Sequence, residues 1–249
     1  MAIHSPQPPA FNVPGPIKIF AGLIIAIHIV RNLLPQAFDI ELLLAFAFIP
    51  ARYSAEVAER FAFPGGFLAD IWTFGTYALI HGDVMHLIIN AFWLLAFGSP
   101  LAWRFGAKRF FLFSLVCAVA GAVLHLVTHV GEFVPVVGAS AAISGHMAAV
   151  TRFMFQAGGP FSGRRDPGAF RVPALPLVEA LKNPQVLVFL GFWLFINLWF
   201  GVSDLGIAGA QGSIAWQAHL GGFFAGLVLF RFFDPVPPGN DRPPIRLAA

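Results

Sequence analysis

Six stretches of the chain are apolar enough, and long enough, to cross a membrane as helices. A spanning helix needs about 20 mostly apolar residues. The hydrophobic pattern predicts such helices at residues 17–34, 84–103, 110–130, 136–155, 185–203 and 213–233. The long connection at 35–83 contains three prolines and a Gly-Gly pair, and its apolar part is too short to cross. Because a connection of this length usually has structure of its own, we expect short helices lying at the membrane surface.

The composition also indicates a membrane protein. Hydrophobic residues make up 58% of the chain and charged residues only 11%, whereas soluble domains contain about 25% charged residues. We therefore predict an all-α membrane protein with one six-helix membrane domain over residues 17–233. Residues 1–16 are expected to form a flexible N-terminal segment, and residues 234–249 a proline-rich C-terminal tail. The single cysteine, Cys117, excludes an intrachain disulfide.

The positions of the basic residues predict how the helices are oriented. If both termini are cytoplasmic, twelve of the fifteen lysines and arginines face the cytoplasm, and only Arg31, Arg52 and Arg60 do not. The positive-inside rule therefore predicts an even number of spans with both ends in the cytoplasm. This asymmetry explains the basic pI of about 9.5. The chain has no dense basic run, so no nucleic acid partner is expected.

Two polar side chains lie inside predicted spans, where polar groups are costly and are functional candidates. Ser140 is near the start of the fourth span, where backbone N–H groups of the first helical turn can stabilise an oxyanion. His219 is in the first part of the sixth span, which starts from the same side, and Gly222 and Gly226 follow on its face. These positions indicate a serine nucleophile and its base. The small residues around Ser140 are equally typical of a helix-packing face.

A third polar group leads into the second span. His86 and Asn90 are four residues apart and therefore project from one face of a helix. Both side chains can donate hydrogen bonds, as an oxyanion site requires, although hydrogen bonding between helices would also explain them. His81 lies about 140° from His86 on an ideal helix, so it should face elsewhere or precede the helix. Polar groups at one depth on three spans favour a single shared site.

The sequence shows no third member of a catalytic triad. Asp83 and Asp204 lie on the same predicted side, but neither has a spacing that connects it to His219. We therefore predict a dyad, in which His219 accepts the proton of Ser140. The absence of an orienting carboxylate need not abolish catalysis, because an oxyanion site contributes to the rate independently.

These residues together resemble the rhomboid family of intramembrane serine proteases. The resemblance covers about residues 70 to 230 and rests on Trp72, His81-x4-His86-x3-Asn90, Gly138-x-Ser140 and Ala218-His219-x2-Gly222-x3-Gly226. It implies that Ser140 is the nucleophile and His219 the base. It also implies that the backbone N–H of Ser140 holds the oxyanion together with His86 and Asn90. His81, Gly138, Gly222 and Gly226 take supporting positions.

The resemblance implies an integral protein of the bacterial inner membrane, without a cofactor or a metal. It would cleave transmembrane or juxtamembrane peptide bonds of single-span or multi-span membrane proteins within the lipid bilayer. Three positions depart from the family pattern: Ala141 follows the nucleophile in place of Gly, Thr73 follows Trp72 in place of Arg, and Ser144 replaces an aromatic residue. None of these changes removes a catalytic group. The sequence does not specify an oligomeric state.

Two other functions fit part of the pattern. A catalytically silent rhomboid-like protein would bind transmembrane helices without cutting them, but the intact Ser140 and His219 argue against it. A histidine-rich membrane metal enzyme is the other alternative, although Leu126 stands where the zinc-protease pattern requires Glu. Its available ligands are His81, His86, His125, His129 and His219. His146, which follows the serine segment, is expected to face a neighbouring helix.

Overall fold

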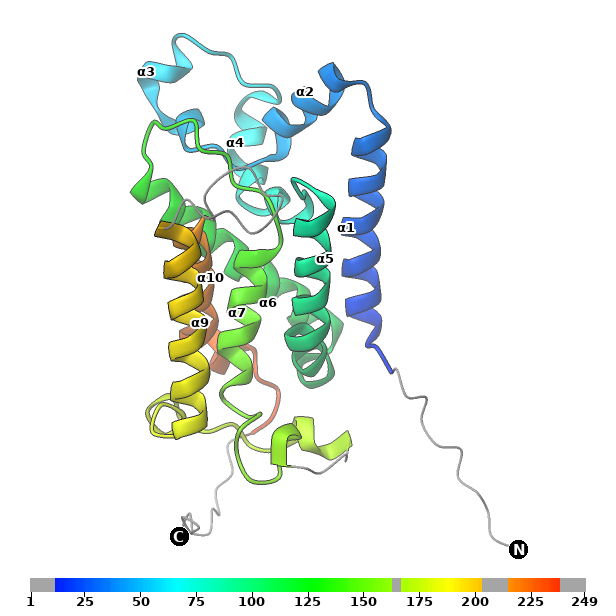
Figure 1. Ribbon diagram of the computed structural model, residues 1–249, viewed down its shortest axis with the longest axis vertical. Helices are drawn as coiled ribbons and strands as arrows, with labels where there is room; N and C mark the ends of the chain where they lie inside the picture. Colours follow the sequence, from blue (N-terminus) through cyan, green and yellow to red (C-terminus); the bar gives the residue numbers. More distant parts are fainter. Residues whose placement is uncertain (1–11, 163–166, 203–214, 238–249) are drawn as a thin grey trace, which may run out of the picture.

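The computed structural model describes residues 12–162, 167–202 and 215–237, which form a helical bundle (Figure 1). The helices that form the body of the bundle are α1 (Gly15–Leu33), α5 (Val84–Trp93), α6 (Ser99–Thr128), α7 (Ser140–Val150), α9 (Pro184–Val202) and α10 (Trp216–Phe233). Within the described ranges, extended residues pair only in an isolated antiparallel bridge between Phe48 and Val136. The all-helical class predicted from the sequence is therefore confirmed.

Three stretches of the described chain have the length and hydropathy of a membrane span: Gly15–Leu33, Val84–Thr128 and Pro184–Gly201. The second stretch contains two of the predicted spans. In it, α5 continues through a π-helical segment, η3 (Leu94–Gly98), into α6. Gly106 interrupts α6 with φ 72° and ψ 171°, a conformation that favours glycine. The chain changes direction there, so the separate helices predicted at 84–103 and 110–130 agree with the structure.

The helix predicted at 136–155 is much shorter than a membrane span. Only Ser140–Val150, 11 residues, are helical, a length of about 16 Å at 1.5 Å per residue. Val136 is instead extended and pairs with Phe48. All residues of α7 after Ser140 are buried inside the bundle. The prediction failed because hydropathy cannot tell a helix surrounded by protein from one surrounded by lipid.

The connection at 35–83 folds into short helices, as expected. They are α2 (Gln36–Phe46), η1 (Pro50–Tyr53), α3 (Ala55–Ala58), α4 (Gly66–Thr76) and η2 (Tyr77–Leu79), and they cover one end of the bundle (Figure 1). The buried Arg52 guanidinium donates to the carbonyl of Leu44 at 2.6 Å. The indole N–H of Trp72 donates to the carbonyl of Ala45 at 2.8 Å. These bonds satisfy carbonyls at the end of α2 that have no partner within the helix.

The connection between α7 and α9 is also partly helical. It contains η4 (Pro160–Ser162), η5 (Pro167–Arg171) and α8 (Leu177–Ala180). The Arg104 guanidinium of α6 reaches this connection and donates to the carbonyl of Phe170 at 2.8 Å. It also forms two 2.8 Å hydrogen bonds with the carboxylate of Asp234. Asp234, which the prediction assigned to the tail, is therefore tied to the bundle.

Glycines bring α6, α7 and α10 into close contact at the centre of the bundle. A Cβ atom built on Gly226 of α10 would lie 2.5 Å from the Cα of Gly145 in α7. A Cβ on Gly222 would collide with the carbonyl oxygen of Ala141. Because any larger residue at these two positions would push the helices apart, the glycine stripe sets the separation of α10 from α7.

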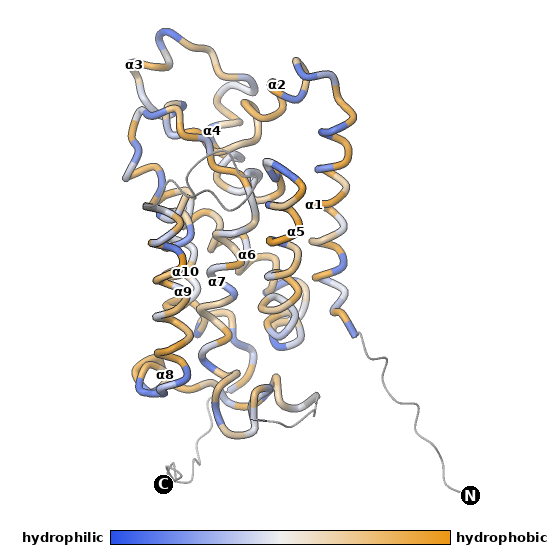
Figure 2. The backbone as a smooth tube through the Cα atoms, viewed as in Figure 1, coloured by the Kyte–Doolittle hydropathy of each residue, from blue (hydrophilic) through white to orange (hydrophobic). Residues whose placement is uncertain are grey.

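Hydrophobic residues predominate along most helices of the bundle (Figure 2). Large hydrophobic side chains are exposed on α1, α5, α6 and α9, among them Ile19, Leu33, Ile88, Phe92, Leu112, Val127, Val188 and Phe192. So many exposed large hydrophobic side chains are unusual in water-soluble monomers and are typical of a protein whose surroundings are lipid.

Candidate active site

Ser140 is the first residue of α7, and the turn before it depends on a glycine. Gly138 has φ +112°, a conformation that side chains rarely adopt. A Cβ on Gly138 would also lie 2.6 Å from Nε2 of His86. Its backbone N–H donates to the carbonyl of the buried Tyr77 at 2.9 Å. Because residue 138 is a glycine, the chain can turn in close contact with the His86 ring, and α7 can begin at Ser140.

Ser140 and His219 are hydrogen-bonded to each other across 79 positions of sequence. The serine Oγ lies 2.8 Å from Nε2 of His219, which is in the first turn of α10. Both side chains are half-buried. This separation is within the range required for proton transfer from a nucleophile to its base.

The other ring nitrogen of His219 is held by Asn197 of α9. Nδ1 of His219 lies 2.6 Å from the Oδ1 atom of Asn197. The amide nitrogen of Asn197 donates to the carbonyl of Trp193, four residues earlier in α9, at 2.8 Å. Because a carbonyl can only accept a hydrogen bond, this contact fixes which amide atom faces the histidine. Oδ1 is an acceptor, so the proton of His219 is on Nδ1 and its Nε2 is free to accept from Ser140.

His86 and Asn90 present hydrogen-bond donors to the turn before Ser140. Asp83 caps α5 by accepting from the backbone N–H of His86 at 2.8 Å. The backbone N–H of Gly82 lies 3.5 Å from Nδ1 of His86 and donates to it. Nε2 of His86, the atom that faces Gly138, therefore carries the proton. The amide nitrogen of Asn90 lies 3.8 Å from the position of a Cβ on Gly138, and it also donates to the carbonyl of His86 at 2.9 Å.

His81 precedes α5, and its ring is hydrogen-bonded to the backbone of the same turn. Its Nε2 accepts a 3.5 Å hydrogen bond from the backbone N–H of Ala139, the residue before Ser140. Its carbonyl accepts from the guanidinium of Arg31 at 2.9 Å. Burial lowers the pKa of His81 to about 3 because the charged imidazolium is poorly solvated there. The neutral ring can therefore accept from the backbone without carrying charge into the site.

His125, His129 and His146 form hydrogen bonds outside this site. Nε2 of His125 lies 3.1 Å from the carbonyl of Val134, and Nδ1 of His129 lies 3.2 Å from the carbonyl of His125. His146 faces Ser114 of α6, in agreement with the expectation that it faces a neighbouring helix. In the described part of the chain, no three His, Cys, Asp or Glu side chains are close enough to hold a metal ion. The geometry therefore lends no support to the metal-enzyme alternative.

Sequence reasoning missed two residues of this site, Asn197 and Tyr77. An amide inside the apolar segment 185–203 is a signal that could have revealed Asn197, since polar groups in a span need a partner. Tyr77 has no such signal, because it acts through its backbone carbonyl and through a hydroxyl buried against the carbonyl of Ala118. Of the two aspartates considered earlier, Asp83 caps α5, and Asp204 lies outside the described residues.

A family model for the Rhomboid domain matches residues 68–233, more than half of the chain and all of the site described above. The chain belongs to the rhomboid family. The resemblance inferred from the sequence is thereby confirmed. Membership indicates an integral membrane protein of the intramembrane-protease type. No protein of curated function matches the chain significantly.

The three departures from the rhomboid pattern have structural consequences of different kinds. Ala141 is buried where its carbonyl faces Gly222. Thr73 is buried and bonds to the Tyr53 hydroxyl at 2.9 Å, so it contributes to the fold of the connection. Ser144 is buried and brings no ring to His219. The ring of His219 is instead held by the hydrogen bond to Asn197.

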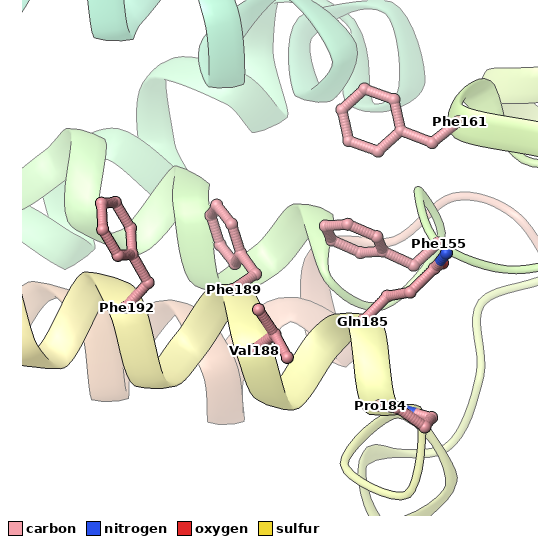
Figure 3. Close-up of a pocket in the computed structure, with 7 residues that line it drawn as sticks. All are labelled: Phe155, Phe161, Pro184, Gln185, Val188, Phe189 and Phe192. Atoms are coloured by element: carbon pink, nitrogen blue, oxygen red, sulfur yellow. The ribbon is translucent and has the colours of Figure 1, made fainter.

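A pocket near the first half of α9 is separate from this site (Figure 3). It is lined by Phe155, Phe161, Pro184, Gln185, Val188, Phe189 and Phe192. None of the site residues contributes to it. The lining is mostly aromatic and aliphatic and contains no titratable group, so the pocket offers no group for hydrolysis.

Proposed function

We propose that this rhomboid is an intramembrane serine protease that cuts transmembrane or juxtamembrane peptide bonds of membrane proteins. The observation that carries the proposal is the continuous chain of hydrogen bonds from Asn197 through His219 to Ser140. Its direction leaves the lone pair of His219 Nε2 facing the serine hydroxyl, which is what a general base requires.

In the proposed first half-reaction, the Ser140 oxygen attacks the carbonyl carbon of the scissile peptide bond. The serine proton passes to Nε2 of His219, and the electron pair of the C=O bond moves onto oxygen. When the tetrahedral intermediate collapses, the C–N bond breaks and His219 returns the proton to the leaving amine. An acyl-enzyme ester on Ser140 remains.

The oxyanion of that intermediate would be stabilised by donors already directed at the turn. These are the Nε2–H of His86, the amide of Asn90 and the backbone N–H of Ser140, where the start of α7 adds a favourable partial charge. In the second half-reaction, water attacks the ester while His219 takes its proton. The C–O bond to Ser140 then breaks, His219 returns the proton to the serine oxygen, and the carboxylic acid product leaves.

If the chain crosses the membrane at all six predicted segments, with the short α7 crossing inside the bundle, both termini lie in the cytoplasm and the site is near the outer leaflet of a bacterial inner membrane. Substrates would be single-span or multi-span membrane proteins, and no cofactor is required by the steps above. The exposed apolar faces of α5 and α9 support entry from the lipid side.

The test is cleavage of a labelled transmembrane substrate by purified protein reconstituted in lipid vesicles. Ser140→Ala should reduce the cleavage rate by about 10,000-fold or more, because the nucleophile is lost. The matched control is Ser114→Ala, which removes a serine that also bonds to a histidine and should retain cleavage. Undiminished cleavage by Ser140→Ala would refute the proposal. An unmodified chain that binds the substrate helix without cutting it would favour the catalytically silent alternative.

A further inference from the structure

Helix α9 contacts the site through Asn197, in its C-terminal half. Its apolar side chains are largely exposed, and Val188 is 73% exposed. Near the site, the ring of Trp193 stacks on Phe223 of α10, with 4.1 Å between ring centroids and 16° between planes. One turn further along, Asn197 reaches His219. Asn197 is thus the polar contact between α9 and the proposed base.

Asn197 lies where an amide is costly unless it is fully paired. Its side chain is buried in the most apolar helix of the bundle, and an unpaired amide there would lose its hydrogen bonds to water without replacement. Both polar atoms of the Asn197 amide are hydrogen-bonded. Its nitrogen donates to the carbonyl of Trp193, and its oxygen accepts from Nδ1 of His219.

The first of these bonds gives the second its direction. Rotation of the amide by 180° would place its oxygen against the carbonyl of Trp193 and its nitrogen against His219. Two acceptors would then face each other, so the anchored orientation is strongly favoured. If the amide nitrogen of Asn197 faced His219, Nδ1 of His219 would have to accept its hydrogen bond, and the ring proton would then be on Nε2. That tautomer cannot take a proton from Ser140.

We propose that Asn197 is a positioning residue that holds His219 in the tautomer able to accept the proton of Ser140, and that it makes the base depend on the position of α9. This inference rests on the proposed function, since it assigns Asn197 a part in the same reaction. Asn197 acts only through His219.

A mechanical consequence follows from the placement of Asn197 on α9. If α9 moves away from α10, Nδ1 of His219 loses its acceptor, and the tautomer bonded to Ser140 loses its advantage. The base is therefore most effective while α9 is packed against α10. A substrate helix that displaced α9 on entry would have to let it return before the serine was activated.

The experiment compares two variants of similar side-chain size, Asn197→Leu and Asn197→Asp. Leu removes both hydrogen bonds, whereas Asp keeps an acceptor for Nδ1–H and loses only the donor to the Trp193 carbonyl. Asn197→Leu should lower kcat by about 100-fold with KM nearly unchanged, since substrate binding does not involve Asn197. Asn197→Asp should stay within about 10-fold of the unmodified chain. Asn32→Leu, which removes a similar hydrogen bond from an amide to the carbonyl four residues earlier in α1, is the matched control and should leave kcat unchanged.

A spectroscopic measurement tests the tautomer without relying on turnover. In protein labelled with ¹⁵N-histidine, the His219 signals, assigned by their loss in His219→Ala, should show a protonated Nδ1 in the unmodified chain and in Asn197→Asp. In Asn197→Leu the Nδ1-protonated signal should weaken. Equal kcat in Asn197→Leu and the unmodified chain would overturn the inference, as would a loss in Asn197→Asp as large as in Asn197→Leu. Loss of activity in Ser140→Ala with full activity in Asn197→Leu would refute the role of Asn197 alone.

Discussion

Two serine–histidine pairs lie in the bundle with the same separation, and only one is arranged as a nucleophile and its base. Ser140 Oγ and Ser114 Oγ are each 2.8 Å from Nε2 of a histidine, His219 and His146 respectively. The first pair is half-buried at the beginning of two helices, whereas the second is buried in the middle of α6 and α7.

The hydrogen bonds around the second pair run in the opposite direction. The Ser114 hydroxyl donates its only proton to the carbonyl of Phe110, one turn earlier in α6, at 2.8 Å. Its contact with His146 must therefore be one in which the histidine Nε2–H donates. Among the residues that the structure describes, Nδ1 of His146 has no hydrogen-bond partner. The ring is packed instead against Phe110, with centroids 5.0 Å apart.

The comparison teaches that separation alone does not identify a catalytic pair. A base needs a free lone pair directed at the hydroxyl, and this is decided by what holds its other nitrogen. Asn197 provides an acceptor for Nδ1 of His219, whereas nothing described does so for His146. A nucleophile also needs donors for the oxyanion, and a serine in the middle of a helix has none, because the N–H groups around it are already bonded within the helix.

The largest expected difference between the two pairs is in reactivity toward a serine-directed fluorophosphonate. Labelling should occur at Ser140 and not at Ser114, since of these two serines Ser140 alone faces a histidine nitrogen that is free to accept its proton. His219→Asn should slow labelling by at least about 1,000-fold, and His146→Asn should slow it by less than about 3-fold. Mass spectrometry of the labelled peptide identifies the serine. Modification of Ser114, or full labelling in His219→Asn, would contradict the proposed difference between the Ser140–His219 and Ser114–His146 pairs.

The next effect concerns the donors that only Ser140 has. Asn90→Ala should lower kcat for peptide cleavage by about 100-fold, because one hydrogen bond to the oxyanion is lost. His86→Ala should act similarly, while the chain stays folded in both cases. The measurement is single-turnover cleavage with the thermal midpoint as a control for folding. A change in KM alone would show that these residues bind substrate rather than stabilise the intermediate.

A smaller effect is expected from the packing that brings Ser140 and His219 together. Gly222→Ala places a methyl group against the carbonyl of Ala141, so α10 must shift relative to α7. We expect a loss of about 1–3 kcal/mol in the free energy of unfolding, together with slower cleavage. Gly191→Ala is the matched control, because a Cβ at that position of α9 has no neighbour within 4 Å. Equal stability of Gly222→Ala and Gly191→Ala would show that the contact does not limit the approach of the helices.

The smallest effect is a dependence of stability on pH that comes from His81. Its pKa is lowered to about 3 by burial, so between that value and its ordinary pKa of about 6.5 the unfolded chain binds a proton that the folded chain does not. Stability should therefore be fully present above pH 6.5 and decline as the pH falls, by about 1.4 kcal/mol per pH unit at most. The thermal midpoint of His81→Gln should fall less between pH 7 and pH 5 than that of the unmodified chain. An identical fall in both proteins would place the pH dependence elsewhere.

Much of the site could be read from the sequence because its chemistry resides in unusual residues. Ser140, His219 and the His86–Asn90 pair stand out as polar groups in apolar segments, and the spacing of Gly222 and Gly226 from His219 is set by helix geometry. The structure brings these residues to one turn around Gly138. The helical class, the family and the short helices of the connection at 35–83 were likewise accessible from periodicity, proline positions and motif spacing.

Other features were decided only by the tertiary structure. The length of α7 depends on its enclosure by the other helices, and hydropathy does not record which neighbours a helix has. The directions of the hydrogen bonds in the two serine–histidine pairs depend on partners from a third helix or an earlier turn. Asn197 lies 22 positions from His219, with a segment between them whose length does not determine how α9 meets α10. The sequence specifies which polar residues are present. Which atom of a hydrogen-bonded pair donates the proton depends on the other contacts of that pair, and these form only in the folded protein.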